Sequence, residues 1–163
     1  MYLHLTDDEY RRLQAHHFEG ESERVSFLFC RWDGSYLDAQ EIDLVALDSH
    51  EIKSRYHLEL KDEVRGRVIR RATELDACLV EAHSHRTSSL AAMSFTDWEG
   101  LNELVPHVLW RLPRRPYGAL VFAETSFDGL AWQSPAGPEP LGLVIGNNAP
   151  CAPTGLSLKR RPQ

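Results

Sequence analysis

The chain has 163 residues, of which 42% are hydrophobic and 26% are charged, as expected for one soluble domain with a sizeable core. Its formal net charge of −6 argues against a general nucleic-acid-binding protein. No apolar stretch has the length of a membrane span, and the first residues do not resemble a secretory signal. The three cysteines form no C-x-x-C pair, which indicates reduced thiols. We therefore expect a cytoplasmic protein with neither nucleic acid nor a membrane as its partner.

Several agreeing signals predict a helix close to the N-terminus. Thr6 is a favourable N-cap, and Glu9, three residues later, is placed to bond back to the Thr6 amide in a capping box. This helix should end near His17 or Phe18. After a polar loop, residues 24–31 predict a first strand, Asp33-Gly34 predicts a turn, and residues 42–47 predict a second strand antiparallel to the first.

The remainder of the chain shows both helical and strand patterns. Apolar residues at helical spacing predict helices over about 60–74 and from Asp97 onward, and apolar runs predict strands at 77–80, 117–123 and 127–132. Pro106 and the prolines at 113 and 116 should interrupt the chain before residue 117. From Ser134 on, proline and glycine are frequent, so we expect irregular or partly disordered chain there. The predicted organisation is one domain over residues 1–135 and a Pro/Gly-rich segment over 136–163 that ends in a basic tail.

The feature that points to chemistry is a pair of histidines at the end of the strand predicted at 77–80. His83 and His85 are two positions apart, so in extended chain both imidazoles point to the same face. Asp97 follows at the start of a predicted amphipathic helix. Two imidazoles and one carboxylate are the ligand set of a catalytic zinc site, in which water holds the fourth position. We therefore predict that His83, His85 and Asp97 bind Zn²⁺.

Each of these residues also has a simpler interpretation. Ser94-x-x-Asp97 is a capping-box pattern, and Thr96-x-x-Glu99 is a competing one. A His-x-His pair is often surface or core histidine, and a single glutamate such as Glu23 is often only a solvated charge. The order of all these residues along one chain favours the metal site. The other histidines are not part of such a set of potential ligands and are expected to be structural or solvated: His4, His16, His17, His50, His57 and His107.

The pattern His83-x-His85, then a short polar loop, then Ser94-x-x-Asp97, resembles the JAMM signature of the JAB/MPN metalloproteases. That signature also includes a glutamate before the first core strand, which is the position of Glu23. Two departures are visible. Asp97 comes one position later than is usual in the family, and Arg86 stands where a proline normally follows the second histidine. The resemblance covers the order of elements over about residues 1–135.

The resemblance implies a single α/β domain with a mixed, curved β-sheet flanked by helices, related to the cytidine-deaminase fold. It implies hydrolysis of the bond after the C-terminal tail of a ubiquitin-like protein, with zinc as cofactor and Ser94 stabilising the oxyanion. Compact members of this size resemble bacterial enzymes found beside ubiquitin-like conjugation systems. Ubiquitin-like conjugates, E1-like and E2-like enzymes and a place in antiphage defence are therefore the implied partners and setting.

The general base and the activity itself leave alternatives open. Glu23 is our choice for the base because it stands at the edge of a buried strand; Glu21 is the alternative, and Glu81 could support the ligands from the same face. The competing function is an MPN-type scaffold that binds without turnover. A zinc nucleobase deaminase is disfavoured because neither H-x-E nor P-C-x-x-C occurs in the chain.

Overall fold

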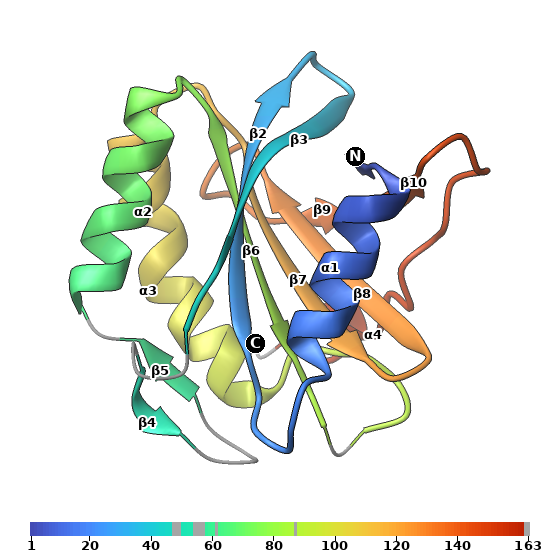
Figure 1. Cartoon of the computed structure of the whole chain (residues 1–163). Helices are drawn as coiled ribbons and strands as arrows, with labels where there is room; N and C mark the ends of the chain where they lie inside the picture. Colours follow the sequence, from blue (N-terminus) through green and yellow to red (C-terminus); the bar gives the residue numbers. More distant parts are fainter. Residues whose placement is uncertain (47–49, 54–57, 61, 87, 162–163) are drawn as a thin grey trace.

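An eight-stranded mixed sheet organises the molecule (Figure 1). The computed structural model describes residues 1–46, 50–53, 58–60, 62–86 and 88–161, with the backbone alone at 50–53, 58–60 and 62. The elements in chain order are β1 (Tyr2–Leu5), α1 (Asp7–His17), β2 (Val25–Trp32), β3 (Tyr36–Leu44), β4 (His50–Lys53), β5 (Leu58–Leu60), α2 (Asp62–Glu74), β6 (Cys78–Ser84), α3 (Phe95–Arg111), β7 (Tyr117–Ala123), β8 (Ser126–Trp132), β9 (Glu139–Pro140), β10 (Gly142–Ile145) and α4 (Leu156–Lys159).

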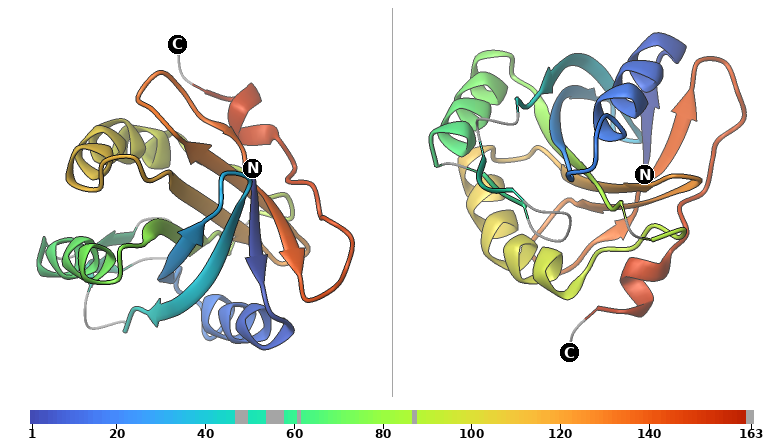
Figure 2. Two further views of the ribbon diagram at one scale, coloured as in Figure 1. Left: turned by 90° about the horizontal axis from the view of Figure 1, so that it is seen from above. Right: turned by 60° about the horizontal axis from the view of Figure 1, so that its bottom comes forward.

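The sheet has the strand order β10-β1-β3-β2-β6-β7-β8-β9, and β4 and β5 pair separately as a small ribbon. Strand β1 lies parallel to both β10 and β3, and β6 is parallel to β7. Because β9 and β10 are separated by Leu141 alone, one short segment pairs with β8 at one edge and with β1 at the other. The sheet is therefore strongly curved and nearly closed, like a barrel, as the two views of Figure 2 show.

Helices cover the two faces of the sheet unequally. Helices α2 and α3 lie side by side against one face, and α1 covers the other (Figure 1). Strand β6 alternates between the two cores: Leu79 packs toward α2 and α3, whereas Val80 and Ala82 pack toward α1. The same alternation places the side chain of residue 83, next after Ala82, on the face that α2 and α3 cover.

Most of the predicted elements are confirmed, with shifted ends. The capping box of Thr6 and Glu9 begins α1, and β2, β6, β7 and β8 lie where strands were predicted. The second strand is antiparallel to the first as predicted, but it runs from Tyr36 to Leu44 and not from 42 to 47. Val45 and Ala46 lie beyond its end, and Leu47 is outside the described residues. The helix predicted from about Leu60 begins at Asp62, because Leu60 belongs to β5.

Two predictions about proline-containing segments are wrong. Pro106 lies inside α3 and does not end it. Its ring is on the exposed side of the helix, as is Asn102, so the Asn102 carbonyl that loses its usual partner faces water. The segment after residue 135 is not irregular throughout, because β9, β10 and α4 lie there and β9 and β10 belong to the main sheet.

A close approach explains how the Pro/Gly-rich segment joins the sheet. The Leu141 amide donates a hydrogen bond to the Gly129 carbonyl at 2.8 Å. A Cβ atom at Gly129 would collide with the Leu141 backbone carbonyl, so glycine is required there. None of the helices in the described parts of the chain is long and apolar enough to cross a membrane.

Candidate metal centre

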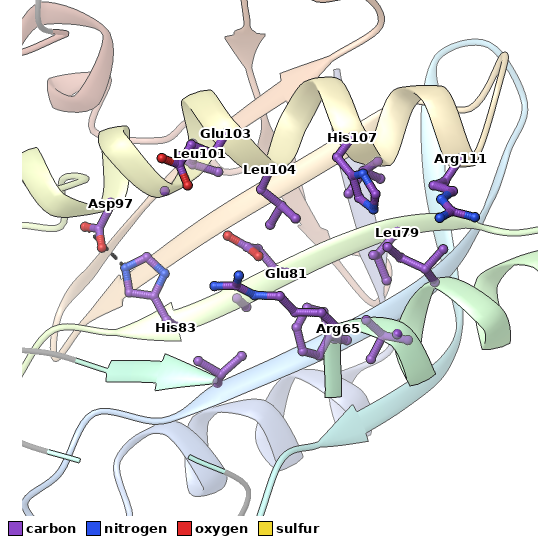
Figure 3. Close-up of a pocket in the computed structure, with 18 of the residues that line it drawn as sticks. Arg65, Leu79, Glu81, His83, Asp97, Leu101, Glu103, Leu104, His107 and Arg111 are labelled. Carbon is purple, nitrogen blue, oxygen red and sulfur yellow. Dashed lines mark ion pairs between the residues drawn. The ribbon is translucent and has the colours of Figure 1, made fainter. Parts of the chain in front are cut away.

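The end of β6 and the start of α3 supply the candidate ligands. His83 is the sixth residue of β6 and His85 follows the strand directly, so both imidazoles lie on the face of the sheet that bears α2 and α3. Asp97 occupies the third position of α3. Figure 3 shows Asp97 approaching His83 from the helix, with an ion pair between them. The three side chains are 14%, 15% and 22% exposed, so they line a pocket and are not surface charges.

The capping box of α3 holds the Asp97 carboxylate in place. The Ser94 amide donates to Asp97 Oδ2 at 2.6 Å, and the Asp97 amide donates to Ser94 Oγ at 3.2 Å. The simpler interpretation of this motif, a helix cap, is therefore correct, and the competing cap at Thr96 does not start the helix. The cap does not exclude metal binding, because it aims Asp97 Oδ2 at the histidines.

The three candidate ligand atoms form a nearly equilateral triangle. Nε2 of His83 lies 3.2 Å from Nε2 of His85. Asp97 Oδ2 lies 3.5 Å from the first nitrogen and 3.2 Å from the second. In a tetrahedral site with bonds of about 2.0–2.1 Å, two ligand atoms are about 3.3–3.4 Å apart. His83, His85 and Asp97 thus form a possible metal-binding triad, with spacings that match one face of a zinc tetrahedron.

Strand pairing brings Glu23 to the same place. In the antiparallel pair of β2 and β6, Val25 is opposite His83, so Glu23, two residues earlier, is level with His85, two residues later. Glu23 is only 8% exposed and lines one cavity together with the triad and Ser94. Glu21, the alternative base, is exposed and does not line that cavity. Glu23, Ser94 and the triad, which the sequence predicted as site residues, therefore converge on one cavity.

The electrostatics of the triad follow from its acidic surroundings. Burial alone would lower the pKa of His83, but Asp97, with smaller effects of Glu81 and Glu23, raises it to about 9. Burial alone would raise the pKa of Asp97, but the two histidines hold it well below its ordinary value. Without metal, His83 is thus protonated at neutral pH and paired with the Asp97 carboxylate. A metal cation bound at His83 would have to displace that proton.

A groove extends from the triad between α2 and α3. The cavity has a volume of about 1500 Å³, and its floor is formed by β6. Glu81 rises from that floor, and the guanidinium of Arg65 points toward its carboxylate (Figure 3). Burial raises the pKa of the Glu81 carboxyl, and the neighbouring Tyr117 hydroxyl and His83 oppose this effect only in part. The predicted placement of Glu81 on the ligand face is correct.

The histidines outside the triad have ordinary structural surroundings where their side chains are described. His17 is fully buried; it contacts the Arg24 carbonyl at 3.2 Å and Ser26 Oγ at 2.9 Å, and burial lowers its pKa to about 3. His4 pairs with Asp38, and His16 contacts the Val25 carbonyl. His107 lines the far part of the groove (Figure 3). The side chain of His50 and the whole of His57 lie outside the described parts of the chain.

Sequence reasoning missed two sets of contacts around the triad. Arg86 was noted only as a departure from a motif, yet it contacts Phe18 and Gly20. The loop before Ser94 is held by the C-terminal segment: the Met93 amide donates to Ser157 Oγ at 2.8 Å, and Ser157 Oγ donates to the buried Asp128 at 2.6 Å. No local sequence pattern predicts these contacts, because their partners lie between 29 and 68 positions away in sequence.

Comparisons with known proteins establish the fold alone. The solution structure of protein DSY2949 from Desulfitobacterium hafniense is similar, with a TM-score of 0.58 over 90% of this chain and 94% of that chain. Its sequence is 16% identical, which supports a shared fold and carries no function. No protein-family model and no curated protein matches the chain significantly.

Proposed function

We propose that the protein is a JAB/MPN-type zinc metalloprotease that hydrolyses the peptide or isopeptide bond after the C-terminal tail of a ubiquitin-like protein. The observation that supports this best is the ligand triangle of 3.2–3.5 Å edges with Glu23 beside it in the same cavity. A cap alone would not need two imidazoles at tetrahedral spacing from its carboxylate. The JAMM-like order of Glu23, His83, His85, Ser94 and Asp97 adds the reaction type.

In this proposal the residues of the chain divide the work of amide hydrolysis. His83, His85 and Asp97 would hold a zinc ion, which supplies the acidity that lets water act as a nucleophile near neutral pH. Glu23 accepts a proton from that water and returns it to the nitrogen of the leaving amine, so the carboxylate is regenerated and no covalent enzyme intermediate forms. Ser94 Oγ accepts the Asp97 amide but keeps its own hydrogen, which is free to stabilise the developing oxyanion.

The shape and lining of the groove between α2 and α3 favour a polypeptide as the substrate. It leads away from the triad over the β6 strand and is lined by both apolar and charged side chains (Figure 3). An extended tail could lie along it and present its final carbonyl to the metal-facing end. We further propose that the natural substrate is made by E1-like and E2-like enzymes, in a bacterial conjugation system of the antiphage type; genes for such enzymes beside the gene for this chain would support that assignment.

The direct test is cleavage of ubiquitin-like proteins that carry a peptide or a lysine side-chain conjugate after the final glycine. The purified full chain is incubated with ubiquitin and with bacterial ubiquitin-like fusions, and products are identified by mass spectrometry. We expect one zinc per chain, and cleavage that stops with a chelator and returns with zinc. A chain that binds no zinc and cleaves none of the fusions would contradict the proposal and favour an MPN-type scaffold.

The base is tested by Glu23→Gln, which keeps size and removes the carboxylate. We expect the variant to keep its zinc and lose cleavage by about a hundredfold or more. Glu21→Gln is the matched control, since Glu21 is exposed and outside the cavity, and it should cleave like the unaltered protein. Full activity of Glu23→Gln would remove Glu23 from the mechanism.

A further inference from the structure

Residues 83–86 alternate between two sets of contacts. His83 and His85 face the groove, while the residues between and after them, Ser84 and Arg86, contact the segment that leads into β2. We propose that Ser84 and Arg86 are positioning residues that hold Glu23 at a set distance from the candidate metal ligands. This inference rests on the proposed role of Glu23 as the base.

Ser84 fixes one end of the Glu23 segment. The Arg24 amide donates to Ser84 Oγ at 3.1 Å, and the Ser84 amide donates to the Arg24 carbonyl at 3.2 Å. Ser84 is fully buried, so its side of this double contact is shielded from water. Arg24 directly follows Glu23, and its partner Ser84 lies between the two histidines in the sequence.

Arg86 fixes the other end. One guanidinium nitrogen donates to the Gly20 carbonyl at 2.7 Å, and the guanidinium lies over the Phe18 ring at 5.2 Å from its centre. Gly20 has a φ of +73°, so the chain turns sharply there before it reaches Glu23. Phe18 ends α1. The segment that carries Glu23 is therefore tied at Phe18 and Gly20 on one side and at Arg24 on the other.

The chemistry of arginine explains why this residue suits the position after His85. A planar guanidinium donates a hydrogen bond and stacks on an aromatic face at the same time. A proline at position 86 would have no side-chain donor and could not reach the Gly20 carbonyl. Lysine could donate but would stack less well. In this chain, Arg86 thus couples the ligand strand directly to the loop of the base.

The test compares Arg86→Ala, Arg86→Lys and Ser84→Ala with the control Arg12→Ala, all as full chains loaded with zinc. Arg12 is exposed on α1, and the control tests for a general effect of removing a positive charge there. Hydrogen exchange of the peptide covering residues 18–24 should become about tenfold faster in Arg86→Ala, be partly restored in Arg86→Lys and stay unchanged in Arg12→Ala. Ser84→Ala should speed exchange of the Arg24 amide.

Turnover is measured with ubiquitin that carries a C-terminal fluorogenic amide. We expect kcat of Arg86→Ala to fall by about tenfold to a hundredfold, with KM and zinc stoichiometry unchanged and partial rescue by lysine. A rise in KM alone would make Arg86 a substrate contact and overturn the inference, as would unchanged hydrogen exchange. If neither the variants nor the unaltered chain turn over the probe, the proposed function fails on this probe. The exchange result still decides whether Ser84 and Arg86 hold the segment that carries Glu23.

Discussion

Ser94 and Asp97 build the helix start and the candidate metal centre with the same atoms. Asp97 Oδ2 accepts the Ser94 amide at 2.6 Å and lies 3.2 Å from Nε2 of His85. The helix cap therefore orients the ligand before any metal arrives. Because the cap and the ligand share one carboxylate, their contributions have to be separated by substitutions that remove one and leave the other.

Asp97→Asn separates the ligand from the cap. The asparagine carbonyl can still accept the Ser94 amide, but it carries no charge and is a poor zinc ligand. We expect zinc affinity to fall by at least about a hundredfold, while the helix content of the apo protein stays the same. Competition with a zinc chelator and circular dichroism measure the two quantities. Equal zinc affinity in both proteins would exclude Asp97 as a ligand.

Two substitutions of Ser94 separate its capping role from its proposed catalytic role. Ser94→Ala removes the N-cap and should lower the free energy of unfolding by about 1 kcal/mol, whereas Ser94→Gly should cost only a few tenths. Both variants lack the hydroxyl that is proposed to stabilise the oxyanion. We therefore expect the two variants to lose cleavage to a similar degree despite their different stabilities. Full cleavage by Ser94→Gly would restrict Ser94 to the capping role.

The apo protein should lose stability as the pH rises. The pKa of His83 is about 9 in the folded chain, above its unfolded value of 6.5, so the ion pair with Asp97 stabilises the fold fully below pH 6.5. That contribution, up to about 3 kcal/mol, is lost as the pH rises toward 9. Thermal melts of chelated protein between pH 6.5 and 9 measure it. Asp97→Asn should flatten the dependence, and an equally steep fall in that variant would refute this origin.

Acid should destabilise the protein through a different histidine. His17 is buried as the neutral imidazole, with a pKa of about 3 against 6.5 in the unfolded chain. Its contribution is complete above pH 6.5 and decreases as the pH falls from 6.5 toward 3, because the unfolded chain takes up the proton first. In His17→Gln the slope of stability against pH should be smaller in this window. His107→Gln, at an exposed position, is the control and should keep the original slope.

The C-terminal segment should affect the metal centre through Ser157. In Ser157→Ala the buried Met93 amide loses its acceptor and the buried Asp128 loses a donor, which should cost about 1–3 kcal/mol. Since Met93 directly precedes Ser94, we also expect weaker zinc binding. Denaturant unfolding and chelator competition test both effects. Ser134→Ala, at an exposed position, should change neither; unaltered zinc affinity in Ser157→Ala would confine that residue to a structural role.

The parts of the fold that the sequence predicts are those with local signals. The capping box at Thr6, the apolar run of β7 and the helical spacing of α2 each depend on residues a few positions apart. Strand β1 was missed because four residues before a helix cap carry too little pattern, and its stability comes from β3 and β10 on either side. Strand β10 was not predicted, because proline and glycine surround it in the sequence. Its stability comes from pairing with β1.

The parts of the candidate site that were predictable are likewise those with local sequence signals. Two-residue spacing puts His83 and His85 on one face, and the cap motif places Asp97 at a helix start. That Glu23 reaches them depends on the register of Val25 opposite His83, which the order of elements indicates but does not set. The Arg86 contact with Gly20 depends on the path of a loop, and no local pattern describes such a path.

The tether from Ser157 to Met93 has a consequence for biosynthesis. All the proposed ligands have been synthesised once α3 is complete. The hydroxyl groups of Thr154 and Ser157, which anchor Ala91 and Met93, come later, 63 and 64 positions after the residues that they anchor. Until residues 154 and 157 are available, a nascent chain therefore lacks both anchors of the loop before Ser94, although the local contacts between Ser94 and Asp97 can already form. Premature termination before Thr154 would yield a protein with every proposed ligand and the residues of the helix cap, but with the loop that leads to Ser94 unanchored.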